Sequence, residues 1–176
     1  MSTNTAADLL ALSTTDVTQP IHKETLYTIL QAPPFVYVPG TFNTRDLGLL
    51  PVPEGCPRIR PGFAYRTASL EGLKPEQGGA VLRDKLGIRR IFDLRSAQEH
   101  DKKPDPSVEG IEVLKLPSRE IDATADLRDF VEGQGEKGYE KMYLEVLDLY
   151  QEGLKAVLAH VRDRPGEAFL FHCNGE

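Results

Sequence analysis

Residues 168–175 read Ala-Phe-Leu-Phe-His-Cys-Asn-Gly, and this stretch decides the fold and the place to look for chemistry. Four apolar residues in a row are typical of a short buried strand, and polar residues follow where that strand ends. The earlier stretch 88–96, Ile-Arg-Arg-Ile-Phe-Asp-Leu-Arg-Ser, has the same plan. In a parallel sheet the carboxyl ends of the strands meet at one edge, where ligands bind. We therefore expect residues 93–96 and 172–176 to lie together on a functional edge.

The other segments alternate between strand and helix patterns. Strands are expected at 35–38, 63–66 and 111–116, and helices at 23–31 and 75–86. From Tyr139 to Val161 apolar residues recur every three or four positions. This predicts a long amphipathic helix, weakest at Gly153, whose apolar stripe lies in the core. Alternating strands and helices indicate an α/β fold, with a mostly parallel sheet flanked by helices.

The length of 176 residues corresponds to one domain. We expect a flexible N-terminal arm over residues 1–20, which are rich in Thr and Ala, and a single α/β domain over residues 21–176. No apolar run reaches the length of a membrane helix, and the N-terminus lacks the features of a secretory signal. The expectation is a cytoplasmic protein without a membrane span.

The formal net charge is −6, which opposes binding to nucleic acid and to anionic membranes. The charge is unevenly distributed. Lys and Arg outnumber Asp and Glu between residues 39 and 98, and acidic residues dominate from 99 to 152. An anionic ligand is therefore expected on the earlier, basic stretch.

Cys56 and Cys173 are the only cysteines, too few for a disulfide scaffold or a four-cysteine zinc site. Cys56 lies in a proline-rich loop without a charged neighbour, and no role is expected for it. Cys173 lies at a strand-to-loop junction, where successive backbone N–H groups can converge on an anion and favour the thiolate. No cofactor and no metal are expected, because no cluster of His and Asp has the spacing of metal ligands.

Four motifs in the chain resemble, in the same order, those of single-domain tyrosine (dual-specificity-like) phosphatases of fungi and bacteria. That family carries Asn-x-Arg-Asp-Leu-Gly, then Arg-Ser/Thr-x-x-Leu, then Asp-Leu-Arg-Ser, and finally His-Cys-x-x-Gly-Lys-Asp-Arg-Thr-Gly. The chain has Asn43-Thr-Arg45-Asp46-Leu-Gly48, Arg66-Thr-Ala-Ser-Leu70, Asp93-Leu-Arg95-Ser96 and His172-Cys173-Asn174-Gly175. Four ordered elements make the resemblance specific, whereas a lone His-Cys pair would be weak.

The resemblance implies hydrolysis of phosphomonoesters through a covalent phosphocysteine, with Cys173 as the nucleophile. His172, Asn174 and Gly175 would then belong to the phosphate loop. Asp93 and Arg95 would brace that loop or lie near the substrate, or form an ordinary structural ion pair. A structural role is expected for the remaining motif residues, Asn43, Arg45, Asp46, Gly48 and Arg66. The substrate stays open among phosphotyrosine, phosphoserine or phosphothreonine in proteins, and phosphoinositides.

The chain departs from the family pattern after Cys173. It has Glu176 where the family places Gly, and it stops before the family's loop arginine and general-acid aspartate. Losing one oxyanion donor typically costs about 10²–10³ in rate, so we expect the chain to be weakly active or inactive. The family's C-terminal helices also have no counterpart. Exposed apolar surface, with marginal stability or a protein partner on the sheet face, is expected.

Two other classes of protein are considered. In the first, the chain is a non-catalytic module, a pseudophosphatase, that binds a phosphorylated ligand or a protein through residues 43–96. In the second, it is a rhodanese-like sulfur carrier, which also places a cysteine in an anion loop. The Asn43-to-Gly48 motif does not belong to sulfur carriers and argues against the second class.

Overall fold

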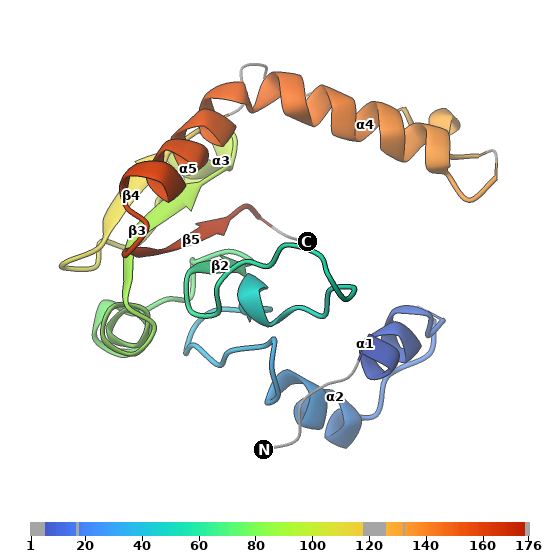
Figure 1. The fold of residues 1–176 in the computed structure, drawn as a ribbon, viewed down its shortest axis with the longest axis horizontal. Coiled ribbons are helices and arrows are strands. Elements are labelled where there is room, and N and C mark those ends of the chain that lie inside the picture. Colours follow the sequence, from blue (N-terminus) through green and yellow to red (C-terminus); the bar gives the residue numbers. More distant parts are fainter. Residues whose placement is uncertain (1–5, 17, 118–125, 132, 175–176) are drawn as a thin grey trace.

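The computed structural model describes residues 6–16, 18–117, 126–131 and 133–174. Its centre is a five-stranded sheet in the order β1-β2-β5-β3-β4 (Figure 1). The strands are β1 (Arg45–Asp46), β2 (Ala64–Thr67), β3 (Ile88–Asp93), β4 (Glu112–Lys115) and β5 (Ala168–His172). Only β1 runs antiparallel to its neighbour. The predicted α/β fold with a mostly parallel sheet is confirmed.

Helices and helical turns connect the strands. The helices are α1 (Ala6–Ser13), α2 (Lys23–Leu30), α3 (Ala97–Lys102), α4 (Glu136–Leu149) and α5 (Gln151–Asp163). Short turns are formed by η1 (Leu47–Leu49), η2 (Pro75–Gly79), η3 (Val81–Lys85) and η4 (Leu127–Phe130). The segment predicted as a helix over 75–86 is helical, but η2 and η3 have the wider π-helical form. Gly87 ends it at φ +68°, a left-handed conformation that favours glycine.

The strand predicted at 35–38 is wrong. Phe35 alone makes a bridge, to Arg45, and the chain then turns at Gly40. The apolar residues of this segment are nevertheless used, since Val38 is fully buried and Val36 packs against the core. A short apolar run predicts burial more securely than it predicts strand pairing.

Two hydrophobic clusters lie on opposite faces of the sheet. The first includes Tyr65, Ile91 and Leu170 and is closed by η3 through Leu82. The second includes the rings of Phe92 and Phe169, and α5 covers it through Ala156 and Val157. Alternate residues of each strand serve opposite faces, so β3 and β5 are buried on both sides.

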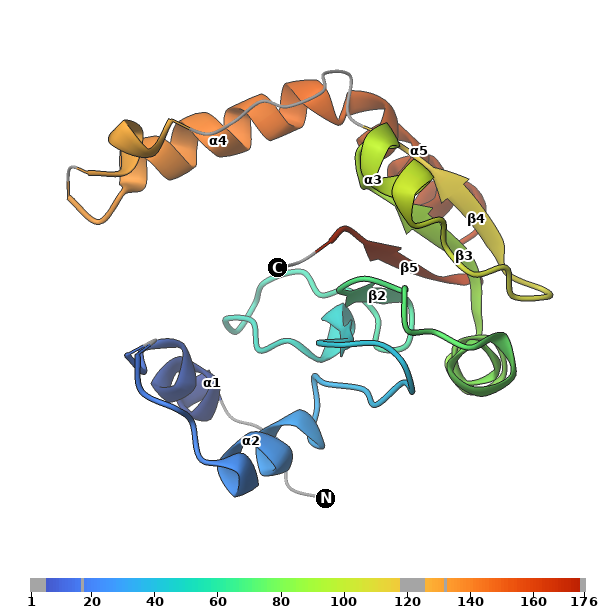
Figure 2. The ribbon, with the colours of Figure 1, turned by 180° about the vertical axis from the view of Figure 1, so that it is seen from behind.

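The long helix predicted over 139–161 is two helices. The break falls at Tyr150, between α4 and α5, and not at Gly153, which lies inside α5 and is buried. Figures 1 and 2 show α5 against the sheet and α4 running out beyond it. The break lets one helix pack on the sheet while the other leaves it.

The prediction that the apolar stripe of these helices lies in the core is wrong for most of its members. Its members are largely exposed in the structure: Tyr139, Tyr143, Val146, Leu147, Leu154, Leu158 and Val161. Val157, also a member of the stripe, does pack against the sheet, together with Ala156 and the buried Gly153 and His160. Periodicity identifies residues that share a face, but it does not show what covers that face.

No helix in the described part of the chain is both long and apolar enough to cross a membrane.

Candidate active site

The carboxyl ends of β2, β3 and β5 bring the motif residues together. His172, at the end of β5, is paired in register with Thr67 of β2 and with Asp93 of β3. Cys173 follows His172 directly, is half-buried and is a free thiol. The expected edge shared by the polar residues after β3 and β5 is therefore present. Gly175 and Glu176 lie outside the described residues.

Under this edge lies a buried charged cluster. The Arg95 guanidinium donates to both oxygens of Asp93, each at 2.9 Å, and to Asp105 Oδ1 at 2.7 Å. His172 Nε2 lies 2.8 Å from Asp105 Oδ2. Because a carboxylate only accepts hydrogen bonds, Nε2 carries the hydrogen. The four side chains are at most 3% exposed, so these bonds fix His172, and the residue after it, from beneath.

Asp93 stays ionised within this cluster. Burial alone opposes its charge, but side-chain and backbone hydrogen bonds from Arg95 outweigh burial and hold the pKa of Asp93 below its usual value. The same bond to Asp93 raises the pKa of Arg95, which remains a cation. Arg95 thus braces the edge through Asp93 and Asp105, and its guanidinium is not free to bind a phosphate.

The same cluster contains donor atoms of the kind that bind metal ions. Oxygens of Asp93 and Asp105 and a nitrogen of His172 lie within 4.8 Å of one another, close enough to share a cation. The Arg95 guanidinium already occupies both carboxylates and would repel a metal ion. The donor set therefore suits an internal salt bridge better than a metal.

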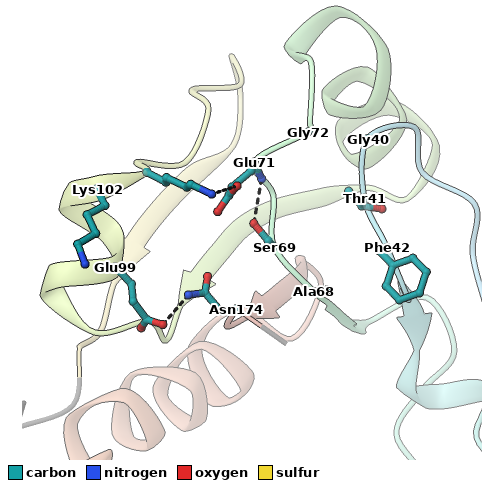
Figure 3. Close-up of a pocket in the computed structure, with 11 residues that line it drawn as sticks. Gly40, Thr41, Phe42, Ala68, Ser69, Glu71, Gly72, Glu99, Lys102 and Asn174 are labelled. Atoms are coloured by element: carbon teal, nitrogen blue, oxygen red, sulfur yellow. Dashed lines mark hydrogen bonds and ion pairs between the residues drawn. The ribbon is translucent and has the colours of Figure 1, made fainter. Parts of the chain in front are cut away.

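A second set of bonds connects α3 to the residue after Cys173. Ser96 caps α3, with its hydroxyl accepting from the Glu99 backbone while the Glu99 carboxylate accepts from Ser96. The Asn174 amide donates to the other Glu99 oxygen (Figure 3). Hydrogen bonds from Ser96, its side chain first, lower the pKa of Glu99. An ionised Glu99 thereby holds Asn174 in place after the end of β5.

A pocket of about 640 Å³ opens beside Asn174. Figure 3 shows its walls, which come from the loop after Val38, the segment after β2, and α3. Its charged members are Glu71, Glu99, Lys102 and Lys103, of which Lys103 pairs with Glu71 at 2.7 Å. Lys102 makes no ion pair with any described residue. Its ammonium group is therefore available to an anion in the pocket.

The Asn43-to-Gly48 motif follows the loop that lines the pocket and is joined to the end of β2. Thr44 and Thr67 join their hydroxyls at 2.7 Å, and Thr41 joins Thr44 at the same distance, so the loop is tied to the end of β2. Asn43 has φ +56°, a left-handed conformation that asparagine tolerates.

Asp46 and Gly48 close the turn after this loop. The buried Asp46 accepts from the backbone N–H groups of Gly48 and Gly62. A Cβ on Gly48 would lie 2.5 Å from the Pro61 nitrogen, so only glycine fits there. The two other motif residues, Arg45 and Arg66, face each other across β1 and β2.

Asp105 is a site residue that the sequence analysis missed. It follows α3 in the segment Lys103-Pro-Asp-Pro106, which has no periodicity and no motif. Its only signal is an acidic residue between two prolines, a rigid setting for a side chain. The partners of its carboxylate, Arg95 and His172, become apparent only in the folded chain.

The fold and this edge define an α/β protein that presents a thiol after a buried parallel strand, next to a polar pocket. The sequence matches the tyrosine phosphatase family over residues 36–175. That range is most of the chain, and the chain belongs to this family. No curated protein matches the sequence.

Proposed function

We propose that the protein hydrolyses phosphomonoesters with Cys173 as the nucleophile. The observation that carries the proposal is the position of Cys173, directly after β5 and beside the pocket of Asn174 and Lys102. The thiolate would attack phosphorus and form the S–P bond, while the alkoxide or phenolate leaves with the electron pair of the broken P–O bond and takes a proton from water. Water would then cleave the S–P bond and release inorganic phosphate.

His172, Asp105 and Asn174 support this chemistry by position. His172 is held from below by Asp105, and Asn174 is held from the side by Glu99, so the backbone around Cys173 is fixed at both neighbours. A fixed backbone keeps N–H groups aimed at a bound phosphate and favours the thiolate. Membership of the tyrosine phosphatase family supports phosphorylated substrates.

We further propose that turnover is weak. Asp93 and Glu99 have lowered pKa values and carry no proton at neutral pH to give to the leaving alcohol. Arg95 is bound to Asp93 and Asp105 and supplies no fork to the phosphate. A general acid typically contributes about 10²–10⁴ in rate. Phosphotyrosine, whose phenolate is a better leaving group than an alkoxide, is then the favoured substrate over phosphoserine or phosphothreonine.

The test compares leaving groups. We expect slow release of phosphate from 4-nitrophenyl phosphate and much slower release from an alkyl phosphate, because only the former leaves without a proton. Cys173→Ser should abolish both activities and the phosphate adduct found on Cys173 after acid quenching. The matched control Cys56→Ser, at an exposed thiol, should retain them. Activity that survives Cys173→Ser would refute the assignment.

A second candidate is a module that binds a phosphorylated ligand without hydrolysing it. It is favoured by the same observations: Lys102 lines the pocket without an ion-pair partner among the described residues, and the Glu99 carboxyl carries no proton. Saturable binding of a phosphotyrosine peptide, weakened by Lys102→Gln and accompanied by no phosphate release from any substrate, would select this candidate.

A further inference from the structure

Two arginines lie opposite each other at one side of the sheet. In the antiparallel β1–β2 pair, Arg45 is the register partner of Arg66. Directly opposed residues point to the same face, with Cβ atoms about 4.5–5.5 Å apart, and like charges in such positions repel. An isolated pair of this kind would be unfavourable.

No carboxylate in the described part of the chain compensates the pair. Neither Arg45 nor Arg66 has an acidic group within ion-pair distance there, and Asp46, next in sequence, is bound to the backbone of Gly48 and Gly62. Arg45 Nε is buried and has no hydrogen-bond partner among the described residues. Burial, and then the charge of Arg66, lower the pKa of Arg45. The pair therefore carries hydrogen-bond donors and positive charge that no carboxylate of the described residues neutralises.

Most other arginines do pair with carboxylates within the described residues: Arg83, Arg90, Arg95, Arg128, Arg162 and Arg164. The β1–β2 pair differs because two guanidinium groups share one face of the sheet. A doubly charged oxyanion matches that arrangement, since each guanidinium can donate two hydrogen bonds to it.

The pair lies near the thiol but is separate from it. Arg66 is the register partner of Phe171 on β5, two residues before Cys173. At about 3.3 Å per residue, this separation along the strand is about 7 Å. An anion bound by the pair would lie beside the site of Cys173 without occupying it.

We propose that Arg45 and Arg66 form a second anion site, for a phosphate group, on the β1–β2 side of the sheet. The site is independent of turnover, because it uses neither Cys173 nor the pocket beside Asn174. Its natural ligand is a free phosphate or a second phosphate of a doubly phosphorylated substrate.

The first test titrates inorganic phosphate into the full chain by calorimetry at constant ionic strength. We expect Arg66→Gln, at an exposed side chain, to weaken binding about tenfold or more through lost charge-assisted bonds. The control Arg162→Gln removes the same charge at an exposed arginine that pairs with Asp163, and should bind as the wild type does. Equal dissociation constants in all three chains, or no binding to the wild type, would overturn the proposal.

The second measurement needs no ligand affinity. In phosphate-free buffer, Arg66→Gln should melt at the same temperature as the wild type or higher, because the repulsion with Arg45 is removed. Added phosphate should then raise the melting temperature of the wild type and hardly that of the variant. The proposal is contradicted if Arg66→Gln melts at a lower temperature than the wild type without phosphate and if phosphate raises its melting temperature by as much as it raises that of the wild type.

Phosphopeptides identify the source of the phosphate. All chains in this experiment also carry Cys173→Ser. If a doubly phosphorylated peptide binds more tightly than its singly phosphorylated form, and only in the chain that keeps Arg66, the site holds a second substrate phosphate. Equal binding of both peptides, with the inorganic phosphate site intact, indicates a free phosphate. Both results support the site. A preference for the doubly phosphorylated peptide that persists in Arg66→Gln opposes it. A failure of catalysis at Cys173 affects none of these readouts.

Discussion

At the scale of single residues, the buried cluster under the sheet edge that carries Cys173 determines what the motif residues can do. Arg95 and His172 both bind Asp105, so one carboxylate connects the strand end before Cys173 to the segment after α3. A buried carboxylate with two such partners is hard to replace, since its loss leaves a cation and an imidazole N–H without acceptors.

Asp105→Asn should lower the free energy of unfolding by about 3 kcal/mol, because it breaks a buried ion pair and leaves Arg95 less compensated. Urea unfolding measures the change. Asp101→Asn is the matched control, since that side chain is 80% exposed and its one ion-pair partner among the described residues is His100 at 3.6 Å. If the two variants are equally stable, Asp105 does not have the proposed supporting role.

The pH dependence of stability should follow Asp93. Its pKa is lower in the folded chain than in the unfolded chain, so its stabilising contribution is full above the unfolded value and is lost as the pH falls through the folded value. We expect stability to fall as the pH drops below about 4. In Asp93→Asn, which is less stable at pH 7, the difference from the wild type should shrink on acidification. A difference that stays constant from pH 7 to pH 3 would contradict this.

At the scale of elements, two helical glycines illustrate how local sequence and packing differ. Gly138 of α4 and Gly153 of α5 are both buried third residues of their helices. A Cβ on Gly138 would lie 2.7 Å from the Phe130 ring and 2.8 Å from the Asp129 carbonyl oxygen, whereas one on Gly153 would meet ordinary contacts at 3.6 Å.

The same substitution should therefore have opposite effects at these positions. Gly138→Ala is expected to destabilise by about 1–3 kcal/mol, because η4 must move away from α4. Gly153→Ala should stabilise by about 0.5–1 kcal/mol, because alanine is the better helix former and has room. Each variant is the control for the other in thermal unfolding. Changes of the same sign would show that the contacts of α4 or α5 are misassigned.

The elements also show why part of the sequence analysis failed. Strands β2, β3, β4 and β5 lie within one or two residues of their predicted positions, because each contains apolar residues in a short segment bounded by turn residues. The segment 35–38 has the same composition but meets no neighbouring strand beyond Phe35. Strand formation needs a partner, and local composition contains no information about one.

At the scale of the whole molecule, α4 stands apart from the sheet and carries exposed apolar side chains. Leu144 is 58% exposed and Leu147 is 53% exposed. Figure 2 shows this helix extending beyond the sheet, with η4 at its far end. Apolar residues that gather on an exposed helix face commonly mark a surface that binds another molecule or promotes association.

The double substitution Leu144→Gln with Leu147→Gln should leave the melting temperature nearly unchanged, because neither side chain is in the core. It should lower the binding of a hydrophobic fluorescent dye to the native chain. Val157→Ser, on the α5 side that packs against the sheet, should instead cost about 1–3 kcal/mol. A large loss of stability in the double variant would show that α4 is packed after all.

The sequence by itself determined the α/β class, the approximate positions of β2, β3, β4 and β5, and the residues that the motifs share with the tyrosine phosphatase family. These follow from local periodicity and from spacing along the chain, which need no partner to be read. Only the tertiary structure decided that Asp105 supports His172, that Arg95 is bound to Asp93 and Asp105, and that α4 leaves the sheet. It also decided that Arg45 faces Arg66. Each of these depends on contacts between residues distant in sequence, which arise only when burial and pairing bring separate elements together.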